Sequence, residues 1–332
     1  MLVGGAMRFR TIFCAVLCAV VFSFASFSQS DSEQKGIRFS VVLEGAFYPS
    51  SERLHSAEPH FSMLDGFYNR VEGRALFSAA YKIPIVLGSH WLLKDSSVTV
   101  LAGAELTPLT IAPFIRADFS PLPFLVFSAG ASGGSGWAIS SLYGIAALDE
   151  ESRTYEPFTA FSAWYYDVWA SALFQFDLGA IVKGDWTHVL FLAGYKVIYK
   201  GVSSVSWHDV WKWQNSGNKV NGLQYEASVI IGYQLPFAVH RIGVITDLFG
   251  NYDSDDYGKF GDSYKGDFVT VKISPFVQVV VSKKDEISIA AQVANRRAFD
   301  EEYPGVNEEV FLHFASYEWF FNRIGARWTH IF

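Results

Sequence analysis

The chain has 332 residues, of which 17% are aromatic and only 18% are charged, and its formal net charge is −7. This acidic balance argues against a nucleic acid partner, because phosphate binding requires a basic patch. Both cysteines, Cys14 and Cys18, lie close to the N-terminus, so the remaining sequence can form neither a disulfide nor a thiolate metal site.

Residues 1–28 have the features of a cleavable export signal. Arg8 and Arg10 precede an apolar run at 12–22, and Ala25 or Ser28 provides a small residue for cleavage. The run is too short to cross a bilayer comfortably as an anchor. Cleavage would leave 24 basic against 33 acidic side chains, a net charge of −9. We expect a short periplasmic segment at 29–36, followed by a single domain at 37–332.

The first segment of this domain alternates between apolar and polar residues. In 37–48, Ile37, Phe39 and Leu43 share one face, and Arg38 and Glu44 share the other. The same period of two recurs at 71–85, 223–235 and 269–281, and it predicts β-strands. These segments are about ten to fourteen residues long, which is more than the ~5–6 residues usual in soluble sheets and enough for a tilted strand to cross a bilayer.

Extending the pattern along the chain predicts twelve strands, with a range of 10–14. Their limits are 37–48, 70–86, 97–107, 109–119, 124–132, 160–182, 186–200, 223–235, 240–250, 268–281, 287–298 and 320–332. Short connections alternate with long ones, except for one tight turn near Pro108. Pro84, Pro113 and Pro275 argue mildly against these strand limits, because proline cannot donate to a strand ladder.

The sequence therefore predicts an all-β protein: a single closed antiparallel transmembrane β-barrel with short periplasmic turns and long extracellular loops. No run after the signal approaches the ~18–20 apolar residues of a spanning helix. Only a closed barrel lets strands satisfy every backbone group in hydrocarbon. The alternative is a secreted β-sandwich with an aromatic core. Aromatic residues near the strand ends favour the barrel, namely Phe47, Tyr81, Tyr199, Tyr225, Tyr233, Phe320 and Trp328.

The last ten residues, RIGARWTHIF, resemble the C-terminal assembly signal of Gram-negative outer-membrane barrels. Ile324, Ala326, Trp328 and Phe332 match its apolar positions, and His330 departs from them. The resemblance implies a location in the outer membrane, contact with its lipid, and recognition by the barrel-assembly machinery. The stretch PLPFLVFSAGASGGSGW also resembles unassigned spirochaete barrel proteins.

The alternation predicts which charged side chains face the lumen, where they would either set selectivity or plug the barrel. The basic members are Arg38, Arg74, Lys82, Arg116, Lys196, Lys200, Arg241, Lys272, Arg296, Arg323 and Arg327. The acidic members are Glu44, Glu72, Glu105, Asp118, Asp167, Asp177, Glu226 and Asp247. Rings of charge tune which solutes pass a pore. Barrels of this size lie between those that side chains fill and those that leave an aqueous channel.

Two loops carry further candidates. Asp253, Asp255 and Asp256 form a weak calcium candidate in an acidic loop, but they lack the glycine and the final glutamate of a helix-loop-helix site. Trp207, Trp211 and Trp213 cluster in another loop. They can bind sugars, enter the lipid interface or cover the barrel mouth as a small core. The spacing of Trp207 and Trp211 also permits a short amphipathic helix.

The sequence predicts a narrow porin-like channel or passive transporter for small polar solutes, without a cofactor. The first alternative is a non-conducting structural or surface-interaction barrel. The second is an outer-membrane lipase or protease. His188 and His330 are candidate histidines for such an enzyme, but neither has a serine at a recognisable spacing. The sequence leaves the solute and the oligomeric state open.

Overall fold

The computed structural model describes residues 36–214, 216–300 and 308–332. The predicted export signal at 1–28 and most of the segment at 29–36 lie outside the described residues. Twelve long strands form one sheet: β1 (Ile37–Ser51), β3 (Leu64–Pro84), β4 (Ser97–Leu106), β5 (Thr110–Leu122), β6 (Leu125–Gly136), β11 (Tyr165–Asp177), β12 (Val189–Val202), β14 (Gly222–Gln234), β15 (Val239–Asn251), β16 (Thr270–Val280), β17 (Asp285–Phe299) and β18 (Phe314–Ile331).

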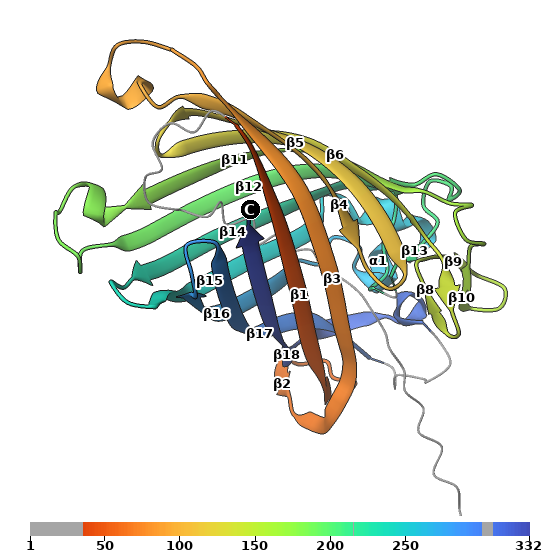
Figure 1. Ribbon diagram of the computed structural model, residues 1–332. Helices are drawn as coiled ribbons and strands as arrows, with labels where there is room; N and C mark the ends of the chain where they lie inside the picture. Colours follow the sequence, from red (N-terminus) through yellow and green to blue (C-terminus); the bar gives the residue numbers. More distant parts are fainter. Residues whose placement is uncertain (1–35, 215, 301–307) are drawn as a thin grey trace, which may run out of the picture.

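The sheet closes into a barrel (Figure 1). Each long strand pairs antiparallel with the next one along the chain, and β1 pairs with β18 from Ser40↔Ile331 to Phe47↔Ile324. Closure leaves no long strand edge available for aggregation. We call the end where β1 begins and β18 ends the terminal rim, and the opposite end the loop rim. The predicted count of twelve strands is confirmed.

The outer wall is apolar, as a barrel in lipid requires. On β11, exposed Tyr166, Val168 and Phe174 alternate with less exposed residues such as Asp167. Exposing such a surface to water is unfavourable, whereas contact with hydrocarbon is not. A closed barrel also satisfies the hydrogen bonds of its own backbone inside the hydrocarbon. The fold is therefore a transmembrane β-barrel. No helix in the described ranges is long and apolar enough to cross a membrane.

Aromatic rings gather near both ends of the apolar wall. Towards the loop rim, Tyr166 and Tyr199 stack with ring centroids 6.3 Å apart, and the hydroxyls of Tyr195 and Tyr252 lie 2.6 Å apart. Towards the terminal rim, Trp186 contacts the Phe237 ring at 5.3 Å between centroids, and Tyr233 donates to the Trp186 carbonyl oxygen at 2.7 Å. Such rings are typical of a barrel at the two membrane interfaces.

Several strand limits differ from the predicted ones. The predicted strand 160–182 is shortened to β11 (Tyr165–Asp177), because residues on both sides turn out of the ladder. β3 begins at Leu64 and β18 at Phe314, about six residues earlier than predicted in each case. Pro113 and Pro275 lie inside strands. Each proline pairs with a residue on one neighbouring strand and falls in a gap of the ladder on the other, where the register is the same on both sides. The missing N–H therefore leaves no ladder bond unmade on that side.

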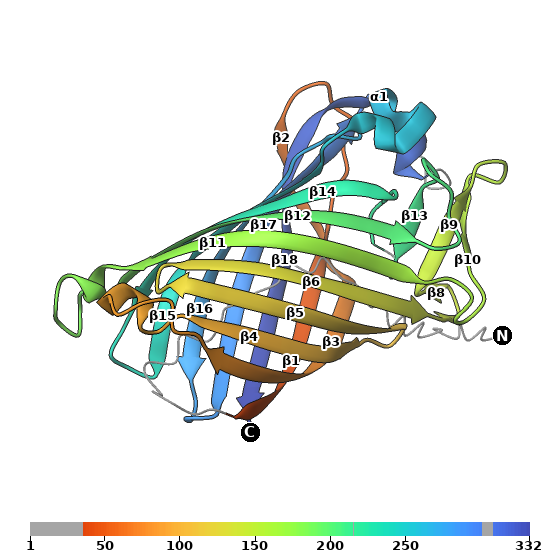
Figure 2. The same cartoon turned by 90° about the horizontal axis from the view of Figure 1, so that it is seen from above.

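The long connections contain structure of their own (Figure 2). They hold β2 (His60–Ser62), β7 (Ala138–Ile139), β8 (Leu142–Tyr143), β9 (Ile145–Asp149), β10 (Thr154–Pro157), β13 (Trp211–Trp213), η3 (Ser254–Phe260), α1 (Gly261–Tyr264) and η4 (Glu309–Phe311). Two short helices, η1 (Trp91–Leu93) and η2 (Leu178–Ala180), lie in connections at the terminal rim. The tight turn near Pro108 joins β4 to β5 at the loop rim.

At the seam of the barrel, β1 and β18 are paired over only part of their length. Above Phe47 and Ile324 the two strands separate, and the free edge of β18 pairs with β2 instead, in parallel, from Glu318↔His60 to Phe320↔Ser62. The Glu318 carboxylate accepts from His60 Nε2 at 2.9 Å and from Ser62 Oγ at 2.7 Å. The connection between β1 and β3 thus completes the barrel wall at the loop rim.

Candidate functional site

The inner face of the barrel is lined with charged side chains that contact one another between strands. Arg74 on β3 lies 2.5 Å from Glu44 on β1 and 3.0 Å from Glu105 on β4. Arg327 on β18 approaches the same Glu44 at 3.5 Å. The backbone register places Glu44 directly opposite both Arg74 and Arg327. Four of the residues predicted from the alternation are thus brought together in one network.

A second network lies on β12 and β14. Lys196 and Lys200 lie 3.2 Å and 3.3 Å from the two oxygens of Glu226. The Lys196 ammonium also lies 4.7 Å from the centre of the Trp169 ring. On the neighbouring strands, Ser132 and Tyr165 donate to the Asp167 carboxylate at 2.5 Å and 2.6 Å. Each acidic group here therefore has a cation or a hydroxyl beside it.

The other predicted charges have local partners. Arg116 pairs with Asp118 at 2.7 Å, and Asp177 contacts His188 at 2.8 Å near the terminal rim. Tyr48 donates to Glu72 at 2.6 Å. Arg323 donates to the Tyr48 hydroxyl at 3.1 Å, and Arg296 pairs with Glu318. Arg38 and Lys82 are exposed near the terminal rim.

The interior is not uniform, and its charged groups fall into two sectors. The first, which we call the open sector, consists of side chains with 13–24% exposure: Glu44, Arg74, Glu105, Arg116, Asp118, Lys196, Lys200, Glu226 and Arg327. The second, which we call the packed sector, lies on β15, β16 and β17. It consists of residues with 1–5% exposure: Arg241, Asp247, Lys272, Ser274, Gln278 and Gln292. Water therefore reaches one side of the interior and is largely excluded from the other.

Hydrogen bonds and an aromatic ring contact the charged side chains of the packed sector. Ser228 donates to Asp247 at 2.5 Å, and Arg241 donates to Gln278 at 3.2 Å. The Lys272 ammonium lies 4.9 Å from the centre of the Phe249 ring. Phe276 is also buried here and lies where a side chain on Gly243 would have to go. This half of the interior resembles a protein core more than a channel wall.

The sequence pattern misplaced Phe320 and missed Glu318. The sequence predicted Phe320 at the outer interface and did not identify Glu318. Both lie on the inner side, where the Arg296 guanidinium sits 4.2 Å from the Phe320 ring centre. The register between β17 and β18 shifts between Gln292 and Val293, which reverses the alternation above that point. No simple period in the sequence signals this shift.

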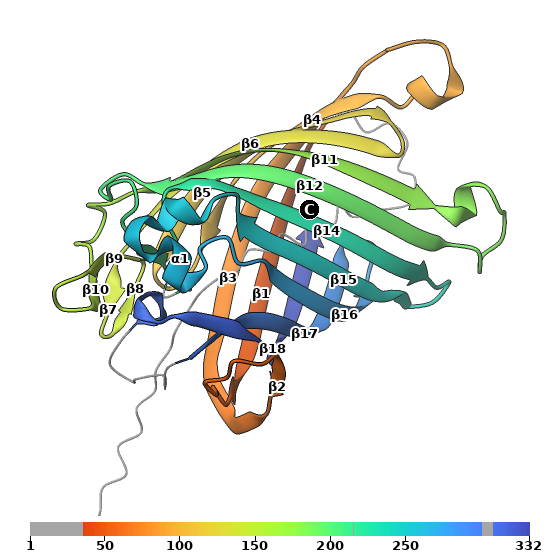
Figure 3. The ribbon, with the colours of Figure 1, turned by 180° about the vertical axis from the view of Figure 1, so that it is seen from behind.

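A cap built from the long connections lies at the loop rim (Figure 3). β9, β10 and β13 form a small sheet, and two apolar clusters pack beneath and beside it. The first cluster joins Trp211 and Trp213 to Leu109, Val202 and Tyr165 of the barrel. The second joins the segment 257–264 to Val310, Leu312 and Phe299. The cap is therefore a folded unit attached to the wall.

Trp213 anchors the cap to the inner wall. Its ring stacks on Tyr165 with centroids 4.8 Å apart, and it lies 2.9 Å from where a Cβ on Gly134 would stand. The next residue, Gln214, donates to the Thr110 hydroxyl, and its backbone N–H donates to the Gly144 carbonyl oxygen at 2.5 Å. The predicted option of a mouth-covering core is thus observed for Trp211 and Trp213. The possible helix is wrong, because 211–213 forms strand β13; Trp207 is exposed.

Tyrosine hydroxyls stiffen the cap outside the membrane. Burial raises the pKa of Tyr155, Tyr257 and Tyr264 above the usual value, so all three stay protonated and can donate. Tyr155 donates to Asn218 at 2.6 Å, and Tyr257 donates to the Asn218 carbonyl oxygen at 2.9 Å. Lys212 adds an ion pair with Glu308 at 2.6 Å.

The predicted acidic calcium candidate has a structural role. Asp253 caps the N-terminus of η3 and accepts from the Asp255 N–H at 2.9 Å. Within the described ranges, no three His, Cys, Asp or Glu side chains are grouped to hold a metal ion. His330, the second candidate histidine, contacts Asp285 at 2.8 Å at the terminal rim.

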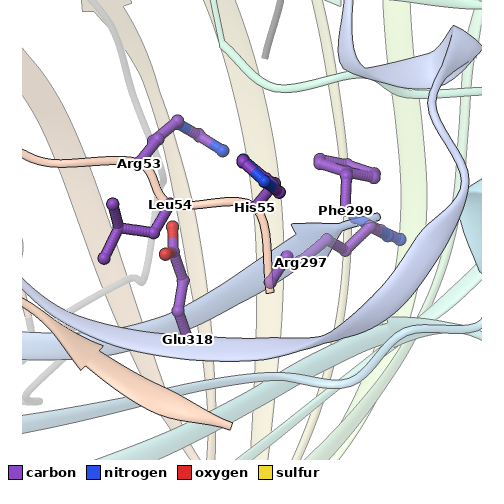
Figure 4. A pocket seen from close by; sticks show the side chains of 7 residues that line it. Arg53, Leu54, His55, Arg297, Phe299 and Glu318 are labelled. Carbon is purple, nitrogen blue, oxygen red and sulfur yellow. The ribbon is translucent and has the colours of Figure 1, made fainter. Parts of the chain in front are cut away.

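A small pocket lies where the connection between β1 and β3 meets the barrel seam (Figure 4). Arg53, Leu54 and His55 line it from the connection, and Arg297, Ala298, Phe299 and Glu318 line it from β17 and β18. It has room for about one water molecule. Arg53 pairs with Glu309 at 2.5 Å, and Arg297 donates to the Lys265 carbonyl oxygen at 2.8 Å. The pocket is therefore a packing feature of the seam.

Comparison with known proteins finds similar solved structures, which have low sequence identity to this chain. No family model and no curated protein matches the sequence. An outer membrane channel from Pseudomonas putida F1 is similar over 92% of this chain and 98% of its own, at 10% identity and a TM-score of 0.43. KdgM porin covers 88% of this chain and 98% of its own, at 7% identity and a TM-score of 0.35. OprB from Pseudomonas putida is similar over 90% of this chain and 94% of its own, at 8% identity and a TM-score of 0.34.

Proposed function

We propose that the chain is a narrow channel for small polar solutes and that its path follows the open sector. The observation that carries the proposal is the difference in exposure within one lumen: the ion-paired side chains of the open sector, on β1, β3–β5, β12, β14 and β18, are 13–24% exposed, whereas Arg241, Asp247 and Lys272 on β15 and β16 are 1–5% exposed. Five cations and four carboxylates line this path: Arg74, Arg116, Lys196, Lys200 and Arg327 against Glu44, Glu105, Asp118 and Glu226. Asp167, which is half-buried and opposite Lys200 in the register, adds a fifth carboxylate, so positive and negative charges nearly balance along the path.

Reversal potentials in planar bilayers test both conduction and the route. Replacing both lysines of the open sector, K196Q with K200Q, removes two positive charges from the proposed path. The expected result is discrete conductance for the wild type and a reversal potential shifted towards cation preference for the double variant. K272Q in the packed sector is the matched control and should leave the reversal potential unchanged. An equal shift in K272Q would show that the path does not follow the open sector.

The second candidate is a non-conducting structural or surface-interaction barrel. The cap favours this candidate, because it is a packed unit fixed to the inner wall by Trp213 and Gln214. A folded, reconstituted protein without discrete openings across a wide voltage range would support it and would contradict the channel. An enzymatic role has weaker support, consisting of the His188–Asp177 pair near the terminal rim.

We also propose that the barrel resides in the outer membrane after cleavage of residues 1–28. On this proposal the terminal rim faces the periplasm, and the cap faces the outside. The alternating tail that ends in Ile324, Ala326, Trp328 and Phe332 supports recognition of β18 by the barrel-assembly machinery.

A further inference from the structure

One group of apolar side chains lies outside both the cap and the membrane-spanning wall. At the tip of the β1–β3 hairpin, five large side chains are open to solvent: Phe61 (56%), Met63 (69%), Leu64 (58%), Phe67 (85%) and Tyr68 (51%). We call these five residues the hairpin patch. Ile139, Phe161 and Trp207 in two other loop-rim connections are exposed as well. In the two cap clusters, by contrast, Trp211, Val220 and Val310 are fully buried. The hairpin patch has no such cover.

The hairpin patch is not needed to span the membrane. On β1 the outward face from Ile37 to Phe47 alone covers about 24 Å, at roughly 3.4 Å per residue and a tilt of about 45°. The apolar band of such barrels is about 25 Å tall. The hairpin patch precedes Val71 in the chain and lies at the loop-rim end of β3, so it extends the apolar surface beyond this band.

The hairpin patch is continuous with the lipid-facing wall. The Phe67 ring lies 5.2 Å from the Phe47 ring, and the Tyr68 ring lies 6.1 Å from it. Phe47 in turn pairs in register with Val71 and Ile324, both on the outer face. The charged residue that follows the patch, Arg70, turns instead to Tyr48 and Glu72. Asp65 and Asn69, which lie in the same segment, are exposed to solvent like the hairpin patch.

We propose that the hairpin patch inserts into the lipid interface of the leaflet on the loop-rim side. An apolar surface that continues the lipid-facing wall and carries aromatic rings matches what enters the boundary between headgroups and acyl chains, to a depth of about 5–10 Å. Insertion would hold β2 against the free edge of β18, because β2 and the patch belong to one hairpin. The lipid would then help to keep the upper seam closed. This inference does not depend on whether the barrel conducts.

Spin labels at single cysteines test the insertion. The labels are placed by M63C and F67C in a full chain that also carries C14S and C18S, reconstituted in phosphatidylcholine vesicles. Collision with oxygen, which partitions into lipid, is compared with collision with a water-soluble nickel chelate. F77C on the lipid-facing wall is the lipid reference, and E58C, an exposed polar position in the same connection, is the aqueous reference.

The expected oxygen-to-nickel ratio at Met63 and Phe67 is several-fold above that at Glu58 and approaches the ratio at Phe77. A ratio equal to that at Glu58 would overturn the proposal. Low collision with both reagents would overturn it as well, because it would show that a second copy or another protein covers the patch. Each variant is first required to show heat-modifiable migration on a gel, so that a folding defect is not taken for exposure. A conductance experiment that failed would leave this result unaffected.

Discussion

At the scale of single residues, the carboxylates of the interior differ in the cations that they contact. Arg74 lies between Glu44 and Glu105, so one guanidinium serves two carboxylates on the two neighbouring strands. Arg116, by contrast, pairs with one carboxylate on its own strand, Asp118. Removing one partner of a poorly solvated ion pair costs more than the pair contributes, because the other charge is left uncompensated.

This difference predicts unequal effects of two arginine substitutions. R74A leaves Glu105 without its cation and Glu44 with Arg327 alone, and should lower the free energy of unfolding by about 3–5 kcal/mol. R116A leaves one more exposed carboxylate and should cost about 1 kcal/mol. Urea unfolding of both variants in lipid vesicles measures the difference. Equal losses would contradict the central position of Arg74.

At the scale of elements, β13 connects a surface loop to the inner wall. Its two tryptophans are buried, while Trp207, a few residues earlier in the same connection, is exposed. Trp213 occupies a space that exists because position 134 is glycine: a Cβ there would lie 2.9 Å from the ring and 2.9 Å from the Ile111 carbonyl oxygen. Because position 134 has no side chain, the inner wall leaves room there for the Trp213 ring of the cap.

Removing this anchor should loosen the cap. W213A loses the contact with Tyr165 and leaves a cavity, at a cost of about 3–5 kcal/mol for a buried tryptophan. We expect faster proteolysis of the connection 203–221 and, if the barrel conducts, a higher open probability in planar bilayers. W207A is the matched control and should behave like the wild type. If both variants were cleaved at the wild-type rate, Trp213 would not be the anchor of the cap.

At the scale of the whole molecule, stability comes from closure. The ladder between β1 and β18 has eight register pairs, from Ser40↔Ile331 to Phe47↔Ile324, and β2 covers the edge above it. No described part of the fold depends on a metal or a disulfide, since both cysteines lie outside the described residues. A closed barrel of this kind resists detergent at room temperature, because opening it would expose unpaired backbone groups to hydrocarbon.

Two gel bands are therefore expected for the intact protein, a compact one without boiling and a slower one after boiling. Truncation of the side chain in F332A should reduce the compact fraction recovered from the outer membrane of expressing cells, because the tail is proposed to be read during assembly. F191A, near the start of β12 and five strands from β18 in the sheet, removes a phenylalanine side chain from the wall away from this tail and serves as the control. A full compact fraction in F332A would contradict the role of Phe332.

The direction of many side chains in the barrel wall was predictable from the sequence, because one rule governs it. A strand with lipid on one face and the lumen on the other must alternate, so its charged residues could be assigned to one face from the sequence. Glu44, Arg74 and Glu105 illustrate this, since the structure brings them into one network. The rule failed at Phe320, where a register shift between β17 and β18 reverses the faces, and it was not applied to Glu318, which lay outside the predicted strand 320–332.

The sequence by itself determined the class of fold, the number of strands and the alternation of the wall, because these follow from local periodicity and from the length needed to cross a bilayer. Only the tertiary structure decided which loop enters the mouth, that the interior divides into an open and a packed sector, and that β2 covers the seam. These features depend on contacts between residues far apart in the chain, such as Trp213 with Gly134 and His60 with Glu318. Periodicity carries no information about such contacts.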